Sequence, residues 1–447
     1  MPSFIKRILG ALVIVAVLIA LNMAMSNEGL FGFGLPYYYS HLLRLAGINI
    51  ILAVSLNLIT GFTGQFSIGH AGFMAIGAYS SVYLTVYYTQ GLEDKLAGAI
   101  GAGAAAALVF LLVVLAGALA AAIAGLIVGI PSLRLRGDYL AIVTLGFAEI
   151  IRIMLVNIKQ VGGPTGFSGA LPPFEGRATI PPYANFLWIG AFAVLTIVVV
   201  YNIVRSNVGR TLISIREDEL AAQAMGINAT RYKVLAFVIS SAFAGIAGAL
   251  FGHYNQFLST QDFQFIRSFE VIIMIVLGGM GSITGSLLGA VVITVLPELL
   301  RTYPYDIVFL LVLIPLTALL LRAIGRRRLP SFLREGAGYY GFVLALYIVL
   351  FVIARLVLIN LLDVDYRLQS VIGDISKYRL VIYSALLIGM MLTRPQGLLG
   401  GREFGLSWLK RAQKRPEGDE AVGTSKGVAI AERDAATADP VKEVENR

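Results

Sequence analysis

Apolar runs separated by short polar or glycine-rich breaks fill most of the first 400 residues of the chain. A helix that crosses a bilayer needs about 17 to 25 mainly apolar residues, and several of the runs have that length. Counting shorter, broken segments as well, we expect about twelve membrane segments in an all-α, polytopic helical bundle. The expected segments are 8–25, 42–60, 70–88, 97–130, 139–157, 186–204, 233–252, two within 269–300, 306–321, 339–360 and 380–392.

Glycine-rich stretches interrupt two of the apolar regions. The first runs from Gly61 to His70 and the second from Gly278 to Gly285. Irregular backbone at membrane depth is tolerated only where it is buried in protein or lines a cavity, so we expect broken or re-entrant helices. Reading 269–300 as one span would leave Arg326–Arg328 outside, against the positive-inside rule. We therefore divide this region into two segments, which places both termini in the cytoplasm.

The composition supports a membrane protein. Of the 447 residues, 57% are hydrophobic and 14% are charged, and the mean hydropathy is +0.81. Soluble domains carry roughly 25% charged residues. A net charge of +9 is also found in proteins that bind nucleic acid, but here Lys and Arg lie mostly between apolar runs, as the positive-inside rule describes. We expect contact with membrane lipid and no nucleic-acid partner.

Small residues and the residue types available for chemistry narrow the picture further. One small residue every four positions, at Gly117, Ala121, Gly125 and Gly129, predicts a helix face suited to close packing. The chain has no cysteine, which excludes disulfides and thiolate metal sites. Its three histidines are far apart in sequence, so we predict neither a metal site nor a cofactor.

The connections and the tail complete the predicted organisation. We expect an outer loop at 92–95 and another at 162–182, and a long span at 97–130 that is tilted or bent and ends at Pro131. Residues 1–400 form the predicted transmembrane domain. The remaining residues, 401–447, are charged and poor in large apolar side chains, which predicts a disordered cytoplasmic tail.

A polar stretch from Arg205 to Phe237 stands out between two apolar runs. Within it, 215–225 has the pattern of a short helix whose acidic first turn suits the helix dipole, with Gly226 as its end and Asn228 as a cap for the next helix. A helix this short is marginal alone in water, so we expect a groove on a cytoplasmic partner to support it. The residues expected to couple to that partner are Arg216, Glu217, Asp218, Glu219, Ala221, Ala222 and Gly226.

These residues carry a resemblance to a known family. The run Glu219-Leu220-Ala221-Ala222, followed by Gly226, resembles the EAA loop by which ABC importer permeases dock onto their ATPase. The longer run 209–227 is similar to the branched-chain amino-acid permeases of the LivM type. Four further stretches resemble the same family, at 57–79, 134–152, 278–289 and 394–400. Together these matches cover most of 42–302 and 378–400.

The resemblance implies half of an importer. Its expected partners are ABC ATPase subunits, a second homologous permease subunit and an extracytoplasmic solute-binding protein, in the cell inner membrane. The chain has no G-x-x-x-x-G-K-[ST] loop, so it is expected to be a transport subunit and not an enzyme. It departs from the family by about seventy additional residues at about 303–376, which carry two extra spans. Lipid-facing padding and an accessory contact are both open explanations of this insert.

The first glycine-rich break is the predicted substrate path, because broken helices present free backbone groups that suit an amino acid. The residues expected along it are Gly61, Gly64, Gln65, Ser67, Gly69, His70 and Glu149. In this interpretation Ser67 caps the helix that follows. The alternative is that the glycines pack two permease subunits together, that His70 is a satisfied buried histidine, and that Glu149 forms a structural ion pair with Arg152.

Other functions remain open at this point. A permease for urea or short amides keeps the mechanism and changes the cargo. A secondary transporter driven by an ion gradient needs no ATPase and depends on a carboxylate such as Glu149. A membrane enzyme has the weakest support, because the sequence contains no recognisable catalytic constellation.

Overall fold

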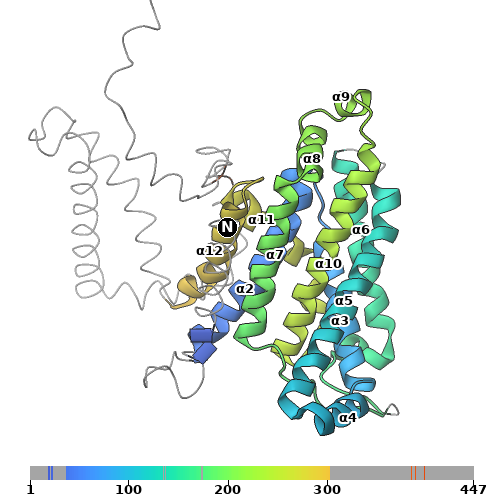
Figure 1. Ribbon diagram of the computed structural model, residues 1–447, viewed down its shortest axis with the longest axis vertical. Coiled ribbons are helices and arrows are strands. Elements are labelled where there is room, and N and C mark those ends of the chain that lie inside the picture. Colours follow the sequence, from blue (N-terminus) through green and yellow to red (C-terminus); the bar gives the residue numbers. More distant parts are fainter. Residues whose placement is uncertain are drawn as a thin grey trace, which may run out of the picture. The chain divides into compact units, whose positions relative to one another are not determined.

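The computed structural model describes residues 37–302, apart from 134, 136, 173 and 174 and the side chains of 299–302, together with a few scattered positions elsewhere (Figure 1). The first expected span at 8–25 is almost wholly outside the described residues. The insert at about 303–376, the last span and the tail at 401–447 also lie outside them, as do both termini.

Helices make up nearly all the regular structure in the described part of the chain. A single bridge pair, Phe167 with Leu258, is the strand-like exception among these residues. The helices are α2 (Tyr37–Asn57), a π-helical turn (Leu58–Phe62), α3 (His70–Tyr87), α4 (Gln90–Ile100), α5 (Ala102–Ser132), α6 (Asp138–Asn157), α7 (Phe186–Arg205), α8 (Asn207–Glu217), α9 (Glu219–Ala224), α10 (Ala229–Asn255), a 3₁₀ turn η4 (Thr260–Phe263), α11 (Phe265–Gly278) and α12 (Ile283–Thr302).

Five helices in the described residues are long and apolar enough to cross a membrane, in agreement with the predicted α-helical membrane bundle. They are Tyr38–Phe62, Ala102–Ser132, Asp138–Asn157, Phe186–Arg205 and Ala229–Asn255. In Figure 1 they run roughly side by side, with α8 and α9 at one end of the bundle and α4 at the other.

Helix α3 is not one of these five helices, and protein surrounds it. It packs against α5, α6 and α10. Protein neighbours allow it to carry polar residues such as Ser81 and Thr85, which are fully buried. Each hydroxyl donates to a carbonyl of the preceding turn, Ser81 to Ala78 and Thr85 to Ser81, so neither is left unsatisfied.

Glycine contacts bring α3, α5 and α10 together at the centre. A Cβ at Gly77 of α3 would lie 2.3 Å from the Cα of Gly245 on α10, and one at Gly117 of α5 would lie 2.8 Å from the carbonyl oxygen of Gly77. The predicted small-residue face of α5 therefore packs within this chain: Gly125 meets Ser241 and Gly129 meets Phe237, both on α10. Lipid provides no hydrophobic driving force between helices, so close van der Waals packing of the backbones stabilises their association instead.

Helices α11 and α12 form an antiparallel hairpin, which confirms the division of 269–300 into two segments. Gly278 and Gly285 face one another across its base, and Gly289 packs on the carbonyl of Met274. The turn between them contains Gly279 and Gly281 at positive φ, 115° and 79°, where other residues would be strained. The hairpin reverses the chain, so α11 and α12 run in opposite directions.

The predicted outer loop at 92–95 is wrong, because these residues lie inside α4. Helix α4 ends at Ile100, and Gly101, with a φ of 87°, separates it from α5. The predicted span at 97–130 is thus the end of α4 plus α5, which continues past Pro131 to Ser132. Glu93 in the first turn of α4 pairs with Arg177 and accepts a hydrogen bond from the Tyr183 hydroxyl, and these tertiary contacts hold the helix in place.

Candidate functional site

The polar stretch forms two helices where the sequence predicts one at 215–225. Helix α8 ends at Glu217, Asp218 is extended, and α9 begins at Glu219. The Asp218 Oδ1 accepts hydrogen bonds from the backbone N–H groups of Leu220 and Ala221, at 2.9 and 3.0 Å. An aspartate side chain competes with the helix for these donors and favours an N-cap position. The acidic run therefore divides the segment, and α8 and α9 together (residues 207–224) are called the coupling segment below.

Two of the predicted coupling residues hold α9 to its own chain. The Ala222 side chain is buried beside Ile215 and Ala229. The Glu219 carboxylate pairs at 2.8 Å with the ammonium of Lys233, which is buried on α10. Gly226 ends the turn at a φ of 83°, as predicted, and Asn228 accepts from the N–H of Arg231 to cap α10. These contacts fix the position of α9 against α10.

The outward face of α9 carries apolar residues that the sequence reading left out. Leu220 is 63% exposed and Met225 is 83% exposed, and the exposed Ala221 lies between them. Leu220 and Met225 are thus exposed apolar side chains outside the apolar spanning helices. The sequence shows two large apolar residues, Leu220 and Met225, on either side of the alanine pair. Only the packing shows that their side chains are exposed.

Arg216 connects the coupling segment to the first glycine-rich break. Its Nη1 donates to the carbonyl oxygen of Gly61 at 3.0 Å, and its guanidinium also pairs with Glu217. Gly64 lies so close that a Cβ there would be 2.8 Å from the Arg216 Cγ. A single charged side chain thus joins a surface helix to an interrupted membrane helix.

The two glycine-rich breaks meet one another. The buried side chain of Asn57 accepts from the N–H of Gly281 at 2.9 Å and donates to the carbonyl of Ser282 at 3.0 Å. A Cβ at Gly61 would lie 2.4 Å from the Gly281 nitrogen. We call this contact between residues 57–64 and 279–282 the break junction. Residues 57–63 of the junction are buried in protein, whereas Gly64 and Met280 are exposed.

The remaining predicted path residues take different positions. His70 is 1% exposed, and its Nε2 is 3.0 Å from the Ser55 hydroxyl. Ser67 is buried and does not cap α3, because the N-cap is Gly69, where no side-chain hydrogen bond is made. Gly69 packs on the backbone of Thr144. Among the predicted path residues of this break, Gln65 has a partly exposed polar side chain.

Glu149 lies on α6, apart in sequence from these residues. Its carboxylate accepts from Arg152 Nε at 2.7 Å, the ion pair that a spacing of three residues predicts. In the described residues there is no group of three or more metal-ligating side chains.

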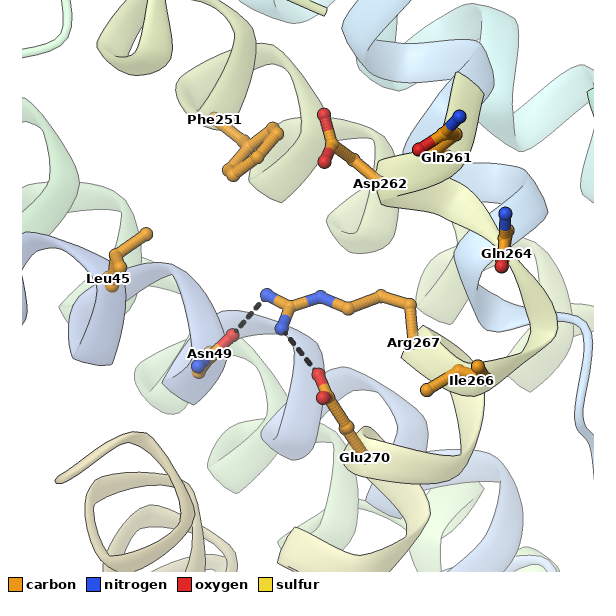
Figure 2. Close-up of a pocket in the computed structure, with 9 residues that line it drawn as sticks. All are labelled: Leu45, Asn49, Phe251, Gln261, Asp262, Gln264, Ile266, Arg267 and Glu270. Atoms are coloured by element: carbon orange, nitrogen blue, oxygen red, sulfur yellow. Dashed lines mark hydrogen bonds and ion pairs between the residues drawn. The ribbon is translucent and has the colours of Figure 1, made fainter. Parts of the chain in front are cut away.

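A cavity of about 310 Å³ opens between α2, α10 and the start of α11 (Figure 2). The Arg267 guanidinium lies near its middle, donating to Asn49 Oδ1 at 2.6 Å and to Glu270 Oε2 at 2.9 Å. Burial raises the pKa of the Asp262 carboxyl above its ordinary value, and the nearby guanidinium and a Ser259 N–H oppose that shift. The residues that line the cavity are Leu45, Asn49, Phe251, Gln261, Asp262, Gln264, Ile266, Arg267 and Glu270.

None of the residues that line this cavity was predicted from the sequence as a site residue. A signal was available, because Arg267 and Glu270 are ionisable residues three apart at the start of an apolar segment, and such residues are by default paired or functional. Asp262 lies five residues before Arg267, whereas Asn49 is 218 positions away, and only the fold brings it to the guanidinium.

The spanning helices and the buried breaks define a polytopic α-helical membrane protein. A family model described as "branched-chain amino acid transport system / permease component" matches residues 38–320, more than half of the chain. The chain belongs to this family. The match ends at 320, so most of the predicted insert lies beyond it.

Individual relatives agree with this assignment. The chain is 39% identical over 283 residues to the high-affinity branched-chain amino acid transport system permease protein LivM of Salmonella typhimurium, covering 57% of this chain and 62% of that protein. It is 38% identical over 290 residues to LivM of Escherichia coli, covering 58% and 63%. The LivH permease protein of Salmonella typhimurium is 25% identical over 262 residues, 57% of this chain and 82% of that protein. The chain therefore spans less than two thirds of the LivM relatives, and no solved structure gives a significant match.

Proposed function

We propose that this chain is the permease subunit of an ABC importer that carries branched-chain amino acids across the cell inner membrane. The observation that carries the proposal is its membership of the permease family over residues 38–320. The LivM relatives are branched-chain amino acid transport permeases, which favours branched-chain amino acids over urea or short amides as the cargo. On this proposal the chain forms the path and has no ATPase activity of its own.

The proposed assembly contains this chain, a second homologous permease, ABC ATPase subunits and an extracytoplasmic solute-binding protein. The similarity to LivH as well as to LivM supports two related permeases in one system. The end of the bundle that bears the coupling segment faces the cytoplasm in this proposal, and the α4 end faces outward. About twelve segments with both termini cytoplasmic remain the proposed topology.

The proposed coupling route runs through the contacts described above. Leu220, Ala221 and Met225 contact the ATPase, while Asp218, Glu219, Ala222 and Gly226 set the shape and position of α9. Movement of α9 shifts α8, and the hydrogen bond from Arg216 to Gly61 carries that shift to the break junction. Glu217 holds the guanidinium in place from the exposed side. Gly61, Gly64 and Gln65 then form the inner end of the substrate path.

Co-purification tests the docking surface. We expect that Leu220→Glu combined with Met225→Glu removes the ATPase subunits from the purified complex, because charge cannot be buried in an apolar groove without a large cost. The matched control is Leu92→Glu, which alters a 44% exposed leucine on α4 at the opposite end. Retention of the ATPase by the double variant, at the level of the control, would refute docking through α9.

Transport in reconstituted vesicles tests the class and the cargo. We expect leucine accumulation that requires ATP and the partner ATPase. Accumulation driven by an ion gradient without any ATPase would instead establish a secondary transporter. ATP-dependent uptake of urea with no uptake of leucine would change the cargo and keep the mechanism.

A further inference from the structure

The cavity between α2, α10 and α11 has the size and the charges of a binding site for a small molecule. Small-molecule sites begin at about 300 Å³, and they combine apolar walls with a few convergent polar groups. This cavity holds about 310 Å³, with Leu45, Phe251 and Ile266 as apolar lining. Five of its six polar residues lie within the stretch 261–270, and the fold adds Asn49 from α2.

The guanidinium of Arg267 has capacity for a further acceptor. An arginine offers five N–H donors, and the two contacts to Asn49 and Glu270 leave donors over. Figure 2 shows the side chain reaching across the cavity, with its planar end between α2 and the Asp262 carboxyl. A carboxylate is the partner that this fork of donors matches in geometry and charge.

Two carboxylates stand on either side of that guanidinium. Asp262 belongs to η4 and Glu270 to the next turn of α11, and Figure 2 places them on opposite sides of Arg267. One oxygen of each is engaged, by the Ser259 N–H and by Arg267. The two carboxylates attract a ligand ammonium group, just as the guanidinium attracts a ligand carboxylate.

We propose that this cavity binds a free α-amino acid as its zwitterion, with the carboxylate on Arg267, the ammonium between Asp262 and Glu270, and the side chain against Leu45, Phe251 and Ile266. The site deepens the function proposed above and rests on it for the identity of the cargo. It gives the permease an amino-acid site of its own, separate from whatever the solute-binding protein selects.

The position of the cavity supports a place on the transport path. Asn49 in the cavity and Asn57 at the break junction lie on the same helix, eight residues or about 12 Å apart along its axis. Helix α11 contributes Arg267 to the cavity, packs along α2, and leads at its other end into Gly281 of the junction. The junction thus lies at one end of the α2–α11 pair and the cavity about 12 Å further along it, consistent with an outer binding site and an inner gate.

Direct binding tests the proposal with the full-length protein. We expect tritiated leucine to bind saturably to the purified chain in a scintillation proximity assay. Unlabelled leucine should displace it, whereas 4-methylpentanoate, which lacks the ammonium, and isoamylamine, which lacks the carboxylate, should not at the same concentration. Absence of saturable binding, or displacement by either analogue as effectively as by leucine, would overturn the zwitterion site.

Substitutions of residues that line the cavity test whether leucine binds there. Arg267→Gln is expected to weaken leucine binding by about tenfold or more, because it removes a charged hydrogen-bond donor from the ligand carboxylate. The matched control is Arg177→Gln, which breaks another partly buried Arg–Glu pair, with Glu93. Leu45→Phe fills the cavity and leaves every charge in place, so it tests the site if Arg267→Gln elutes as an aggregate in size-exclusion chromatography. Equal affinity of wild type and Leu45→Phe would contradict the assignment.

Uptake measurements separate a failure of this site from a failure of the proposed function. If ATP-dependent leucine uptake is normal in wild type and unchanged in Arg267→Gln, the importer assignment stands and the cavity has no part in it. If wild type shows no ATP-dependent uptake, the importer assignment fails, and the binding assay alone then decides whether the cavity takes an amino acid.

Discussion

At the scale of single residues, the most informative side chains are those that connect regions distant in sequence. Arg216 joins α8 to Gly61, Asn57 joins the two glycine-rich breaks, and Lys233 anchors α9 through Glu219. Each is a polar group that satisfies buried backbone or a buried charge. Breaking such a bond would leave a buried polar group without a partner, which costs free energy, so the elements that it joins are expected to move together.

Arg216 offers a test of coupling at this scale. We expect Arg216→Gln to lower ATP-dependent uptake by about tenfold, equivalent to about 1.4 kcal/mol, because the Gly61 carbonyl loses its charged donor. ATPase co-purification should persist, since Arg216 is not on the outward face of α9. Arg210→Gln, which removes an exposed arginine of the same helix that bonds to Asn207, is the control. Loss of the ATPase together with uptake would place Arg216 in the docking surface instead.

At the scale of elements, close backbone crossings hold the central helices. Gly77, Gly117 and Gly245 allow α3, α5 and α10 to approach until backbone meets backbone. Their small size substitutes for the hydrophobic effect, which does not act between helices in lipid. The α11–α12 hairpin uses the same device at Gly278 and Gly285.

A glycine pair on α5 tests this packing. Gly117→Val should lower the free energy of unfolding by about 1 to 3 kcal/mol or more, because its Cβ would press on the carbonyl of Gly77. Gly103→Val changes the same residue types on the same helix where nothing lies within 4 Å, so it should be close to neutral. The midpoint of thermal unfolding in detergent measures both. Equal midpoints for the two variants would show that the crossing does not limit stability.

At the scale of the whole molecule, the described helices have two distinct ends. The coupling segment occupies one end, and α4 with the loop that carries Arg177 occupies the other. The cavity and the break junction lie along the axis between these ends. This polarity is what an importer needs, because energy enters at one face and substrate at the other.

Cysteine labelling tests the orientation of the two ends. The natural chain has no cysteine, so a single introduced thiol reports its own position. In intact cells, a membrane-impermeant maleimide should label Leu92→Cys and leave Met225→Cys unlabelled until the membrane is opened. Both positions are well exposed, so access is limited by the membrane alone. The reverse pattern would invert the proposed topology.

The sequence by itself determined the class of protein, the division of 269–300 and the polar segment with its end at Gly226. These features depend on hydrophobic run length, charge placement and glycine conformation, which are local properties. The resemblance to the permease family also rested on local motifs, and the family match confirms it.

Only the tertiary structure decided which faces are free and which groups meet. Ala222 is covered by Ile215 and Ala229, while Leu220 and Met225 are open, although all lie within a few residues. The break junction and the cavity join residues more than two hundred positions apart. No periodicity encodes such contacts, because they depend on how whole helices pack, and packing is set by the complete set of helix faces at once.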